Sequence, residues 1–342
     1  MLSLKKRLLD RIDARKVHSV PASRLGGISF YPSIMLALWI TSIVGMYIYP
    51  DSEIICFDKR IILECTAIMA LYLVAIYDDI LEVAYRKKFV IQIFAATCIV
   101  VSGTYFTSLN GVLGIYDIPS YVGIPITIFL LVFITNSINL IDGIDGLASS
   151  LSIIALLTYG VVFLINDAIM SSIFAFATLG ALAPFCYNNI FGIRKRGKSK
   201  IFMGDAGALV IGAILGFMAV QMWEMQSVNG FSKNEHFASI LAITVLLIPC
   251  LDVIRIIIHR FRDHKPLFLP DKNHIHHKFL SLGFSARKSL LSILTMDIFF
   301  IMLNLLLTRY FNLTIIIIVD VLMWTVIHIV ISKKILKHNS AK

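Results

Sequence analysis

Four acidic or amide side chains recur at every third position in the stretch NSINLIDGIDGLA, residues 136–148. They are Asn136, Asn139, Asp142 and Asp145. Such spacing places neighbours on adjoining sides of the last turns of a helix. A carboxylate at a helix C-terminus meets the negative end of the helix dipole, which disfavours it. We therefore expect a positive group nearby, either a basic side chain or a cation such as Mg²⁺, which prefers oxygen ligands.

A plain turn is the alternative interpretation of the same stretch. Asp-Gly pairs are ordinary turn chemistry, and this explains Gly143 and Gly146. It does not explain Asn136 and Asn139, which follow an apolar run that reads as a membrane span. Polar residues near or inside a membrane are rare and usually functional. The pattern therefore favours a functional site.

A second cluster is the acidic pair Asp78–Asp79 in LYLVAIYDDILEVAYRKK. Two adjacent carboxylates beyond a span repel each other and also lie at the negative end of a helix. A solvated helix end is the alternative. Because three basic residues follow at 86–88, the pattern favours a cation or phosphate site.

A third cluster is KIFMGDAGALVIG, residues 200–212, in which Asp205 stands at the start of a span. Asp is a good helix N-cap, which is the structural interpretation. The functional interpretation is a metal ligand or a phosphate site at a helix N-terminus. The preceding basic loop, RKRGKSK, supports phosphate binding.

A fourth cluster is PDKNHIHHKF, residues 270–279, which holds His274, His276 and His277. Three histidines within four residues indicate metal or phosphate contact. A closed structural zinc site is disfavoured because thiolates are absent and the spacing is not that of a zinc finger.

The elements that must position these clusters are membrane helices. The chain has 342 residues, is 58% hydrophobic and has a mean hydropathy of +0.84, whereas soluble proteins are roughly 45–50% apolar. Ten apolar stretches are long enough to span or nearly span a bilayer. They cover 28–49, 61–77, 89–109, 122–140, 147–165, 168–187, 207–223, 237–258, 290–308 and 312–331.

The distribution of basic residues predicts the orientation. With an even number of spans, 27 of the 31 Lys and Arg residues lie on the side of both termini. The positive-inside rule makes that side cytoplasmic. We expect an all-α polytopic membrane protein with about ten transmembrane helices, both termini cytoplasmic and all four clusters on the cytoplasmic face. The net charge of +10 then reflects topology and anionic lipid or phosphate, not nucleic acid.

The chain divides into one membrane domain with short basic ends. Residues 1–27 form a basic segment, interpreted equally well as an interfacial amphipathic helix or a solvated tail. Residues 28–331 form a single catalytic membrane domain with a cytoplasmic His loop at about 259–289, and 332–342 form a basic tail. The five cysteines lie far apart, so no disulfide framework or metal motif is predicted.

Taken in order, the four clusters resemble those of the polyprenyl-phosphate N-acetylhexosamine-1-phosphate transferases over about residues 16–290. The Asp-Asp pair, N-x-x-N-x-x-D-G-x-D-G-L, F-M-G-D and H-x-H-H all occur in family order. The PDKNHIHHKF loop resembles the bacterial WecA/TagO-type branch. In the family a membrane span usually precedes the segment that reads HSVPASRLGG here, at 18–27, where this chain has only the basic segment.

The resemblance implies transfer of a sugar 1-phosphate, most simply GlcNAc-1-phosphate, from a UDP-N-acetylhexosamine to undecaprenyl phosphate, with release of UMP. It implies Mg²⁺, or Mn²⁺, held by Asp205 and Asn139, and a bacterial inner-membrane location. The lipid bilayer is a partner, and a second copy of the chain is a candidate partner. As catalytic residues it implies Asp78, Asp79, Asp142, Asp145 and His276. As substrate-binding residues we name Asn136, Lys200, Phe202 (stacked on uracil), His274, His277 and Arg86.

Two other functions fit parts of the pattern. A transporter would also need polar groups in its spans, but transporters place them near the bilayer midplane. Here the four clusters lie near one face, although Asp297 and Asp320 lie well inside the last two spans. A zinc-dependent intramembrane hydrolase would use the histidines but leaves Asp78, Asp79 and Asp205 unexplained.

Overall fold

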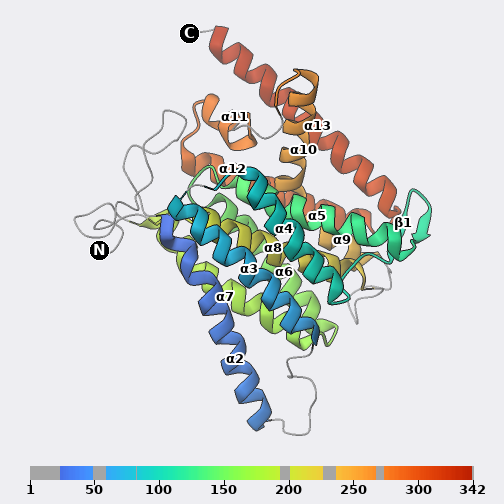
Figure 1. The fold of residues 1–342 in the computed structure, drawn as a ribbon. Coiled ribbons are helices and arrows are strands. Elements are labelled where there is room, and N and C mark those ends of the chain that lie inside the picture. Colours follow the sequence, from blue (N-terminus) through green and yellow to red (C-terminus); the bar gives the residue numbers. More distant parts are fainter. Residues whose placement is uncertain are drawn as a thin grey trace.

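The computed structural model describes residues 24–48, 59–81, 83–192, 201–225, 236–266 and 273–340. Within these ranges the chain is helical except for one β-hairpin and short connections (Figure 1). The elements of the first half are η1 (Arg24–Ser29), α2 (Phe30–Ile48), α3 (Lys59–Leu81), α4 (Tyr85–Val101), β1 (Ser108–Val112), β2 (Ile115–Asp117), α5 (Ser120–Ile141) and α6 (Leu147–Ile165). Those of the second half are α7 (Ile169–Phe191), α8 (Gly204–Trp223), α9 (Phe237–Thr244), α10 (Leu247–Arg262), α11 (Ile275–Ser281), α12 (Ala286–Leu307) and α13 (Leu313–Ser340).

The all-α membrane fold is confirmed, while the number of spans is not. Among the described residues, eight helices are long and apolar enough to cross a membrane, and nine if α9 and α10 are one broken span with a 58° bend. The structure differs at the predicted span 89–109, the third in chain order. Helix α4 has 17 residues and ends at Val101, after which Gly103 adopts a positive φ of 101° and the chain turns into the hairpin. The side of the membrane on which the termini lie stays a prediction.

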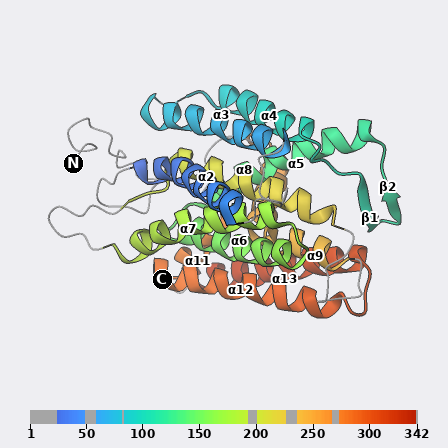
Figure 2. The same cartoon turned by 90° about the horizontal axis from the view of Figure 1, so that it is seen from below.

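Helix α8 lies at the centre of the bundle (Figure 2). Every residue from Ala206 to Trp223 is buried, and α3, α5 and α6 pack around it. A Cβ at Gly212 would lie 2.8 Å from the Cα of Thr135 in α5, so a glycine is needed for these two helices to approach this closely. The burial of α8 fixes its first residues against the ends of its neighbours.

The antiparallel β-hairpin closes one end of the bundle. Figure 2 shows it opposite the end where α11 and the C-terminus of α13 lie. The Trp223 indole at the end of α8 donates to the carbonyl of Ser108 at 2.7 Å, and Asn110 Nδ2 donates to the carbonyl of Trp223 at 2.8 Å. Because α8 has 20 residues and rises about 1.5 Å per residue, its first residues lie about 30 Å away at the opposite end.

Within the described residues, the segment predicted as a His loop and the predicted basic tail both contain helix. Residues 259–289 contain helix α11, and α13 continues through the predicted tail as far as Ser340. A hydrophobic cluster joins Ile275 and Phe279 of α11 to Ile141, Ile144 and Leu147 around the Asp-Gly turn. This cluster holds the histidine segment against the acidic turn.

Candidate active site

The acidic pair at the end of α3 holds the start of α8. The Asp79 carboxylate accepts hydrogen bonds from the backbone N–H groups of Asp205 and Ala206, each at 3.0 Å. Amides in the first turn of a helix have no partner within that helix, so Asp79 caps α8 from a neighbouring helix. Asp205 itself lies in the first turn, and the N-cap position belongs to Met203. In this structure a carboxylate occupies these two amides, and the interpretation of the helix start as a phosphate site stays a prediction.

Lys88 supplies positive charge beside these acids. Its Nζ lies 2.6 Å from Oδ2 of Asp205 and also forms an ion pair with Asp78. Asp78 is 5% exposed, and its other oxygen accepts from the backbone N–H of Val83 at 2.6 Å. One ammonium group is thus shared by carboxylates from α3 and α8, which offsets their mutual repulsion.

The FMGD stretch is held in place from the N-terminal side. The N–H of Gly26 donates to the carbonyl of Phe202 at 3.1 Å, and that of Gly27 donates to the carbonyl of Met203 at 2.9 Å. A Cβ on Gly27 would clash with the backbone of Gly207 in α8. The two glycines therefore let η1 lie directly on the backbone before and within the first turns of α8. The Phe202 side chain is half-buried.

The predicted placement of a carboxylate at the negative end of the α5 helix dipole is present. Asp142 directly follows the helix as its C-cap residue. Burial, together with the negative charges of Asp145 and Asp205, raises the pKa of the Asp142 carboxyl to about 7. The influence of Asp205 means that the acidic turn and the FMGD stretch, about sixty residues apart in the chain, lie near each other. A cation bound here would relieve this charge cost.

The two asparagines of α5 have different surroundings. Asn136 Nδ2 donates to Gln92 Oε1 of α4 at 2.5 Å and to the carbonyl of Val132 at 2.7 Å. Asn139 is half-buried, and its side chain has no hydrogen bond to the residues that the structure describes. Asn136 therefore joins two helices, whereas Asn139 is available to a ligand.

Asn189 of α7 links the acidic turn to the FMGD stretch. It is 3% exposed; its Oδ1 accepts from the N–H of Gly146 at 2.5 Å, and its Nδ2 donates to the carbonyl of Ile201 at 2.7 Å. Gly146 adopts a φ of 81°, a conformation that favours glycine. The predicted turn is therefore real, and a buried amide fixes it.

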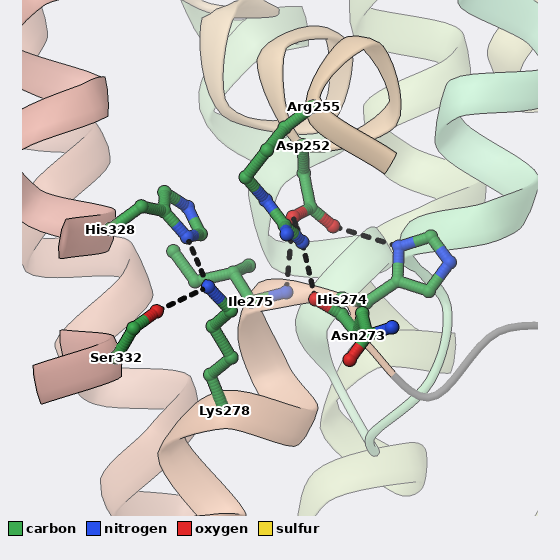
Figure 3. Close-up of polar contacts among 8 residues, drawn as sticks. All are labelled: Asp252, Arg255, Asn273, His274, Ile275, Lys278, His328 and Ser332. Atoms are coloured by element: carbon green, nitrogen blue, oxygen red, sulfur yellow. Dashed lines mark hydrogen bonds and ion pairs between the residues drawn. The ribbon is translucent and has the colours of Figure 1, made fainter. Parts of the chain in front are cut away.

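Asp252 of α10 organises the histidine segment (Figure 3). It is completely buried, and its Oδ2 lies 2.8 Å from Nδ1 of His274. Its Oδ1 accepts from the N–H of Ile275 at 3.1 Å and from Arg255 Nη2 at 3.0 Å. Asp252 thereby caps α11 and sets the His274 ring, leaving the Nε2 of that ring directed away from the carboxylate.

His276 lies directly on the acidic turn. A Cβ on Gly143 would overlap the Nε2 and Cε1 atoms of the His276 ring. The ring is 1% exposed, and neither nitrogen has a hydrogen-bond partner among the described residues. Burial and the neighbouring His277 and His274 rings lower the pKa of His276 to about 3, so it is neutral at pH 7. Gly143 is thus required for the contact between α11 and the acidic turn, which joins the two parts of the site.

Lys278 ties the same short helix to α13 (Figure 3). Its Nζ donates to Ser332 Oγ at 2.9 Å and lies 3.2 Å from Nδ1 of His328. Burial and the Arg255 guanidinium lower the pKa of Lys278 to about 8.

Some predicted residues are not brought together with the rest. Arg86 is exposed, and its Nε donates to the hydroxyl of Tyr85 at 3.3 Å, so Lys88 takes the place beside the acids. Lys200 lies outside the described residues, as do 1–23 and 270–272 of the predicted clusters.

Comparisons with known proteins show that the chain is similar to enzymes that transfer a sugar phosphate to a polyprenyl phosphate. The model of Glycosyl transferase family 4 matches residues 61–223. The chain is 30% identical over 302 residues to a decaprenyl-phosphate N-acetylglucosaminephosphotransferase of Mycolicibacterium smegmatis, covering 82% of this chain and 70% of that protein. It is 28% identical over 295 residues to a probable undecaprenyl-phosphate N-acetylglucosaminyl 1-phosphate transferase of Bacillus subtilis, covering 85% and 75%.

The chain belongs to the polyprenyl-phosphate hexosamine-1-phosphate transferase family. An Escherichia coli K12 undecaprenyl-phosphate alpha-N-acetylglucosaminyl 1-phosphate transferase is also 27% identical over 284 residues, covering 82% of this chain and 71% of that protein. The family resemblance seen in the motifs is confirmed, and this transferase is an enzyme, so the transporter alternative is wrong.

The donor atoms of this transferase fit a magnesium ion better than zinc. Within the described residues, no three His, Cys, Asp or Glu side chains converge to hold a metal, which gives the zinc hydrolase alternative no site there. Mg²⁺ usually binds one or two carboxylates and takes its other ligands from water and substrate phosphates. The predicted ligands Asp205 and Asn139 carry oxygen donors of that type, with Asp205 paired to Lys88 in this structure.

Four functional candidates were missed from the sequence: Lys88, Asn189, Asp252 and Lys278. Asp252 carried a usable signal, because a carboxylate within the apolar run LLIPCLDVIRIII is rare in a membrane helix and indicates a partner. Asn189 carried a weaker one as part of an Asn pair at the end of a span. Nothing in the sequence distinguishes Lys88 from the two basic residues before it.

Proposed function

We propose that this transferase moves GlcNAc-1-phosphate from UDP-GlcNAc to undecaprenyl phosphate and releases UMP. One observation carries the proposal. This observation is the convergence of the motif segments at one end of the bundle: His276 lies against Gly143, Asn189 joins the acidic turn to the FMGD stretch, and Asp79 caps the helix that carries Asp205. The proteins of B. subtilis and E. coli that the chain resembles are named for undecaprenyl phosphate and N-acetylglucosamine, and this supports the choice of both substrates.

An apolar cavity gives the lipid a place to lie. The cavity has a volume of about 360 Å³ between α5, α8, α9, α10 and α13. Helix α10 lines it with Leu247, Leu251 and Ile254, and Asp252 and Arg255 of the same helix belong to the histidine part of the site. A polyprenyl chain in the cavity would bury its isoprene units against apolar side chains, with its phosphate toward the polar end of α10.

The reaction forms one bond and breaks one. An oxygen of the lipid phosphate attacks the phosphorus that is joined to the sugar, the bond from that phosphorus to the oxygen of the UMP phosphate breaks, and UMP leaves with that oxygen. Such transfers depend mainly on positioning and charge neutralisation. In this proposal Lys88 supplies positive charge, and the neutral His276 ring helps to position a substrate oxygen through a hydrogen bond. The basic loop before Ile201 is a candidate contact for the nucleotide.

A divalent cation bound by Asp205 and Asn139 would supply further positive charge to the diphosphate. Asp78 and Asp79 we assign to holding Lys88 and α8, because their oxygens are engaged with those groups. A role for Asp79 as proton acceptor would require it to leave the N-terminus of α8. Asp145, Phe202 and His277 remain candidate substrate contacts, and a homodimer stays a prediction.

The orientation is part of the proposal, because UDP-sugars are made in the cytoplasm. The bias in Lys and Arg supports a cytoplasmic site. Single cysteines at positions 142, 205 and 277 in a background without native cysteines should react with a membrane-impermeant maleimide only after the cells are opened. Reaction of any of the three from outside intact cells would overturn the orientation.

The decisive assay uses the purified chain in detergent or nanodiscs. UMP release from UDP-GlcNAc should require both undecaprenyl phosphate and Mg²⁺, and the lipid product should carry one GlcNAc and two phosphates by mass spectrometry. A panel of UDP-GlcNAc, UDP-GalNAc and UDP-MurNAc-pentapeptide tests the sugar. Turnover with the muramoyl pentapeptide alone would contradict the assignment.

A further inference from the structure

The last helix of the chain lies beyond all four sequence motifs, yet it contacts the histidine segment through a polar cluster. Lys278 is the fourth residue of α11, and its ammonium group reaches His328 Nδ1 at 3.2 Å and Ser332 Oγ at 2.9 Å. The two partners are one turn apart on α13, and His328 is 5% exposed. Figure 3 shows the Lys278 side chain extended between them, away from the His274 and Asp252 pair.

Neither hydrogen-bond partner of Lys278 is a carboxylate. A half-buried ammonium group without a carboxylate is costly unless it is hydrogen-bonded. The contact therefore depends on the geometry of both α13 side chains, and the loss of either one leaves the lysine incompletely satisfied. This dependence makes the cluster sensitive to the spacing between α11 and α13.

The placement of α11 also determines the placement of His276. Helix α11 has only seven residues, Ile275–Ser281, so packing and polar contacts must fix it. It packs against α12 and α13. His276, one turn or less from Lys278, contacts Gly143 and has no hydrogen bond of its own among the described residues. Contacts of α11 with its neighbours therefore decide where this ring lies over the acidic turn.

We propose that Lys278, His328 and Ser332 form a latch that holds α11 against α13 and so positions His276 for the transfer reaction. All three act as positioning residues; none is assigned a contact with substrate. The latch complements the Asp252 cap on the other side of α11, so the helix is held both from α10 and from α13. The kinetic part of this inference rests on the proposed function, whereas the structural part does not.

The kinetic test uses the full-length enzyme in nanodiscs with UDP-GlcNAc and undecaprenyl phosphate. Lys278→Met should lower kcat about tenfold or more, since small displacements of positioned groups have effects of this size, while KM for UDP-GlcNAc changes less than about twofold. Ser332→Ala and His328→Leu should lower kcat in the same sense. Lys334→Met, which removes an exposed charge from the same helix outside the latch, should behave as wild type.

The double variant separates a latch from a substrate contact. If the residues act together, Lys278→Met with His328→Leu should be no more than about twofold slower than Lys278→Met alone. Lys278→Arg, which keeps donors for both partners, should restore part of kcat. If Lys278 instead binds a phosphate, its loss should raise KM while Ser332→Ala and His328→Leu stay near wild type, and that result overturns the latch.

Amide hydrogen exchange tests the latch without any turnover. Exchange at 275–281 should become at least about tenfold faster in Lys278→Met and in the milder Ser332→Ala, with residues 206–223 of α8 unchanged. Unchanged exchange at 275–281 in a folded Ser332→Ala protein would overturn the proposal. An inactive wild-type protein would contradict the proposed function, while faster exchange in the variants would still support the latch.

Discussion

The two halves of the site use their polar residues differently. The acidic half consists of Asp78, Asp79 and Asp205 with Lys88, and each of these side chains already has a partner across a helix boundary. The histidine half consists of Asp252, His274 and His276, and there the residue nearest the acidic turn, His276, has no hydrogen-bond partner among the described residues. Motif residues can therefore be structural in one half of the site and available to a ligand in the other half.

This difference separates two groups of residues. Those of the first group hold the site together, and those of the second group would find their partner in a bound ligand. Asp79 and Asn136 are engaged in a helix cap and an amide pair. Asn139 and His276 lack such bonds, and the raised pKa of Asp142 reports a charge that the protein itself does not neutralise. We expect ligand-dependent effects at the second group and stability effects at the first.

The largest effect is expected at Asp205, which belongs to both groups because it pairs with Lys88 and is the proposed cation ligand. Asp205→Asn should lower kcat about 100-fold or more, the size seen when one preorganised electrostatic group is removed. In thermal unfolding, Mg²⁺ should stabilise the wild type in the presence of UDP-GlcNAc, and this stabilisation should be absent in the variant. A folded variant with near-normal turnover would contradict the assignment of Asp205 as a cation ligand.

The next effect is expected at Asp142 and depends on pH. Its carboxyl has a pKa of about 7 in the fold against an ordinary value of 3.8, so the native state holds the proton more tightly. Stability from this group is present at pH 4, falls as the pH rises and is lost above pH 7. Without metal, Asp142→Asn should therefore be more stable than wild type at pH 8, by on the order of 1 kcal/mol, and similar at pH 4.

Asp142→Asn should also lose activity, so the variant gains stability at pH 8 while its reaction rate falls. Thermal unfolding at both pH values in EDTA, compared with UMP release at pH 8, measures the two effects. Equal stability of the variant and wild type at pH 8 would contradict the charge cost assigned to Asp142, whatever the activity.

A smaller effect is expected where the two halves touch. Gly143→Ala places a Cβ on the His276 ring, so the ring or the turn must shift, and kcat should fall about tenfold. Gly180→Ala is the matched control, because nothing lies within 4 Å of a Cβ there. If Gly143→Ala keeps full activity, the contact between His276 and the turn has no part in the reaction.

Much of this arrangement could be predicted from the sequence, because hydropathy and motif order are local properties. Each of the ten apolar stretches corresponds to helical structure, although the stretch at 89–109 ends in a turn and a strand. The acidic turn was predicted from its Asp-Gly pairs, and Gly146 adopts the positive φ such a turn needs. These features depend on residues close together in the chain.

The partners could not be predicted, because they depend on how distant helices meet. Asp78 and Asp79 are identical in type, and only the orientation of α3 makes Asp79 the cap of α8. Lys88 rather than Arg86 reaches the acids because of its place on α4. Asp252 meets His274 across 22 positions of sequence, from a helix that follows the 58° bend between α9 and α10.

The smallest effect on activity is expected at Asn136, although it belongs to the N-x-x-N-x-x-D-G-x-D-G-L motif. Its amide pairs with Gln92 between α5 and α4, so Asn136→Ala should leave a buried amide unsatisfied and lower the free energy of unfolding by about 1–2 kcal/mol. Activity per folded molecule should stay within about threefold of wild type. Gln92→Ala should show the same pattern. The double variant should lose less free energy of unfolding than the sum of the two single variants, because both remove one shared interaction.

Asn139→Ala is the contrast. Its side chain has no hydrogen bond to the described residues, so stability without Mg²⁺ should hardly change while turnover falls. If Asn136→Ala lost more activity than Asn139→Ala at equal folding, the division between structural and ligand-binding residues within this motif would be wrong.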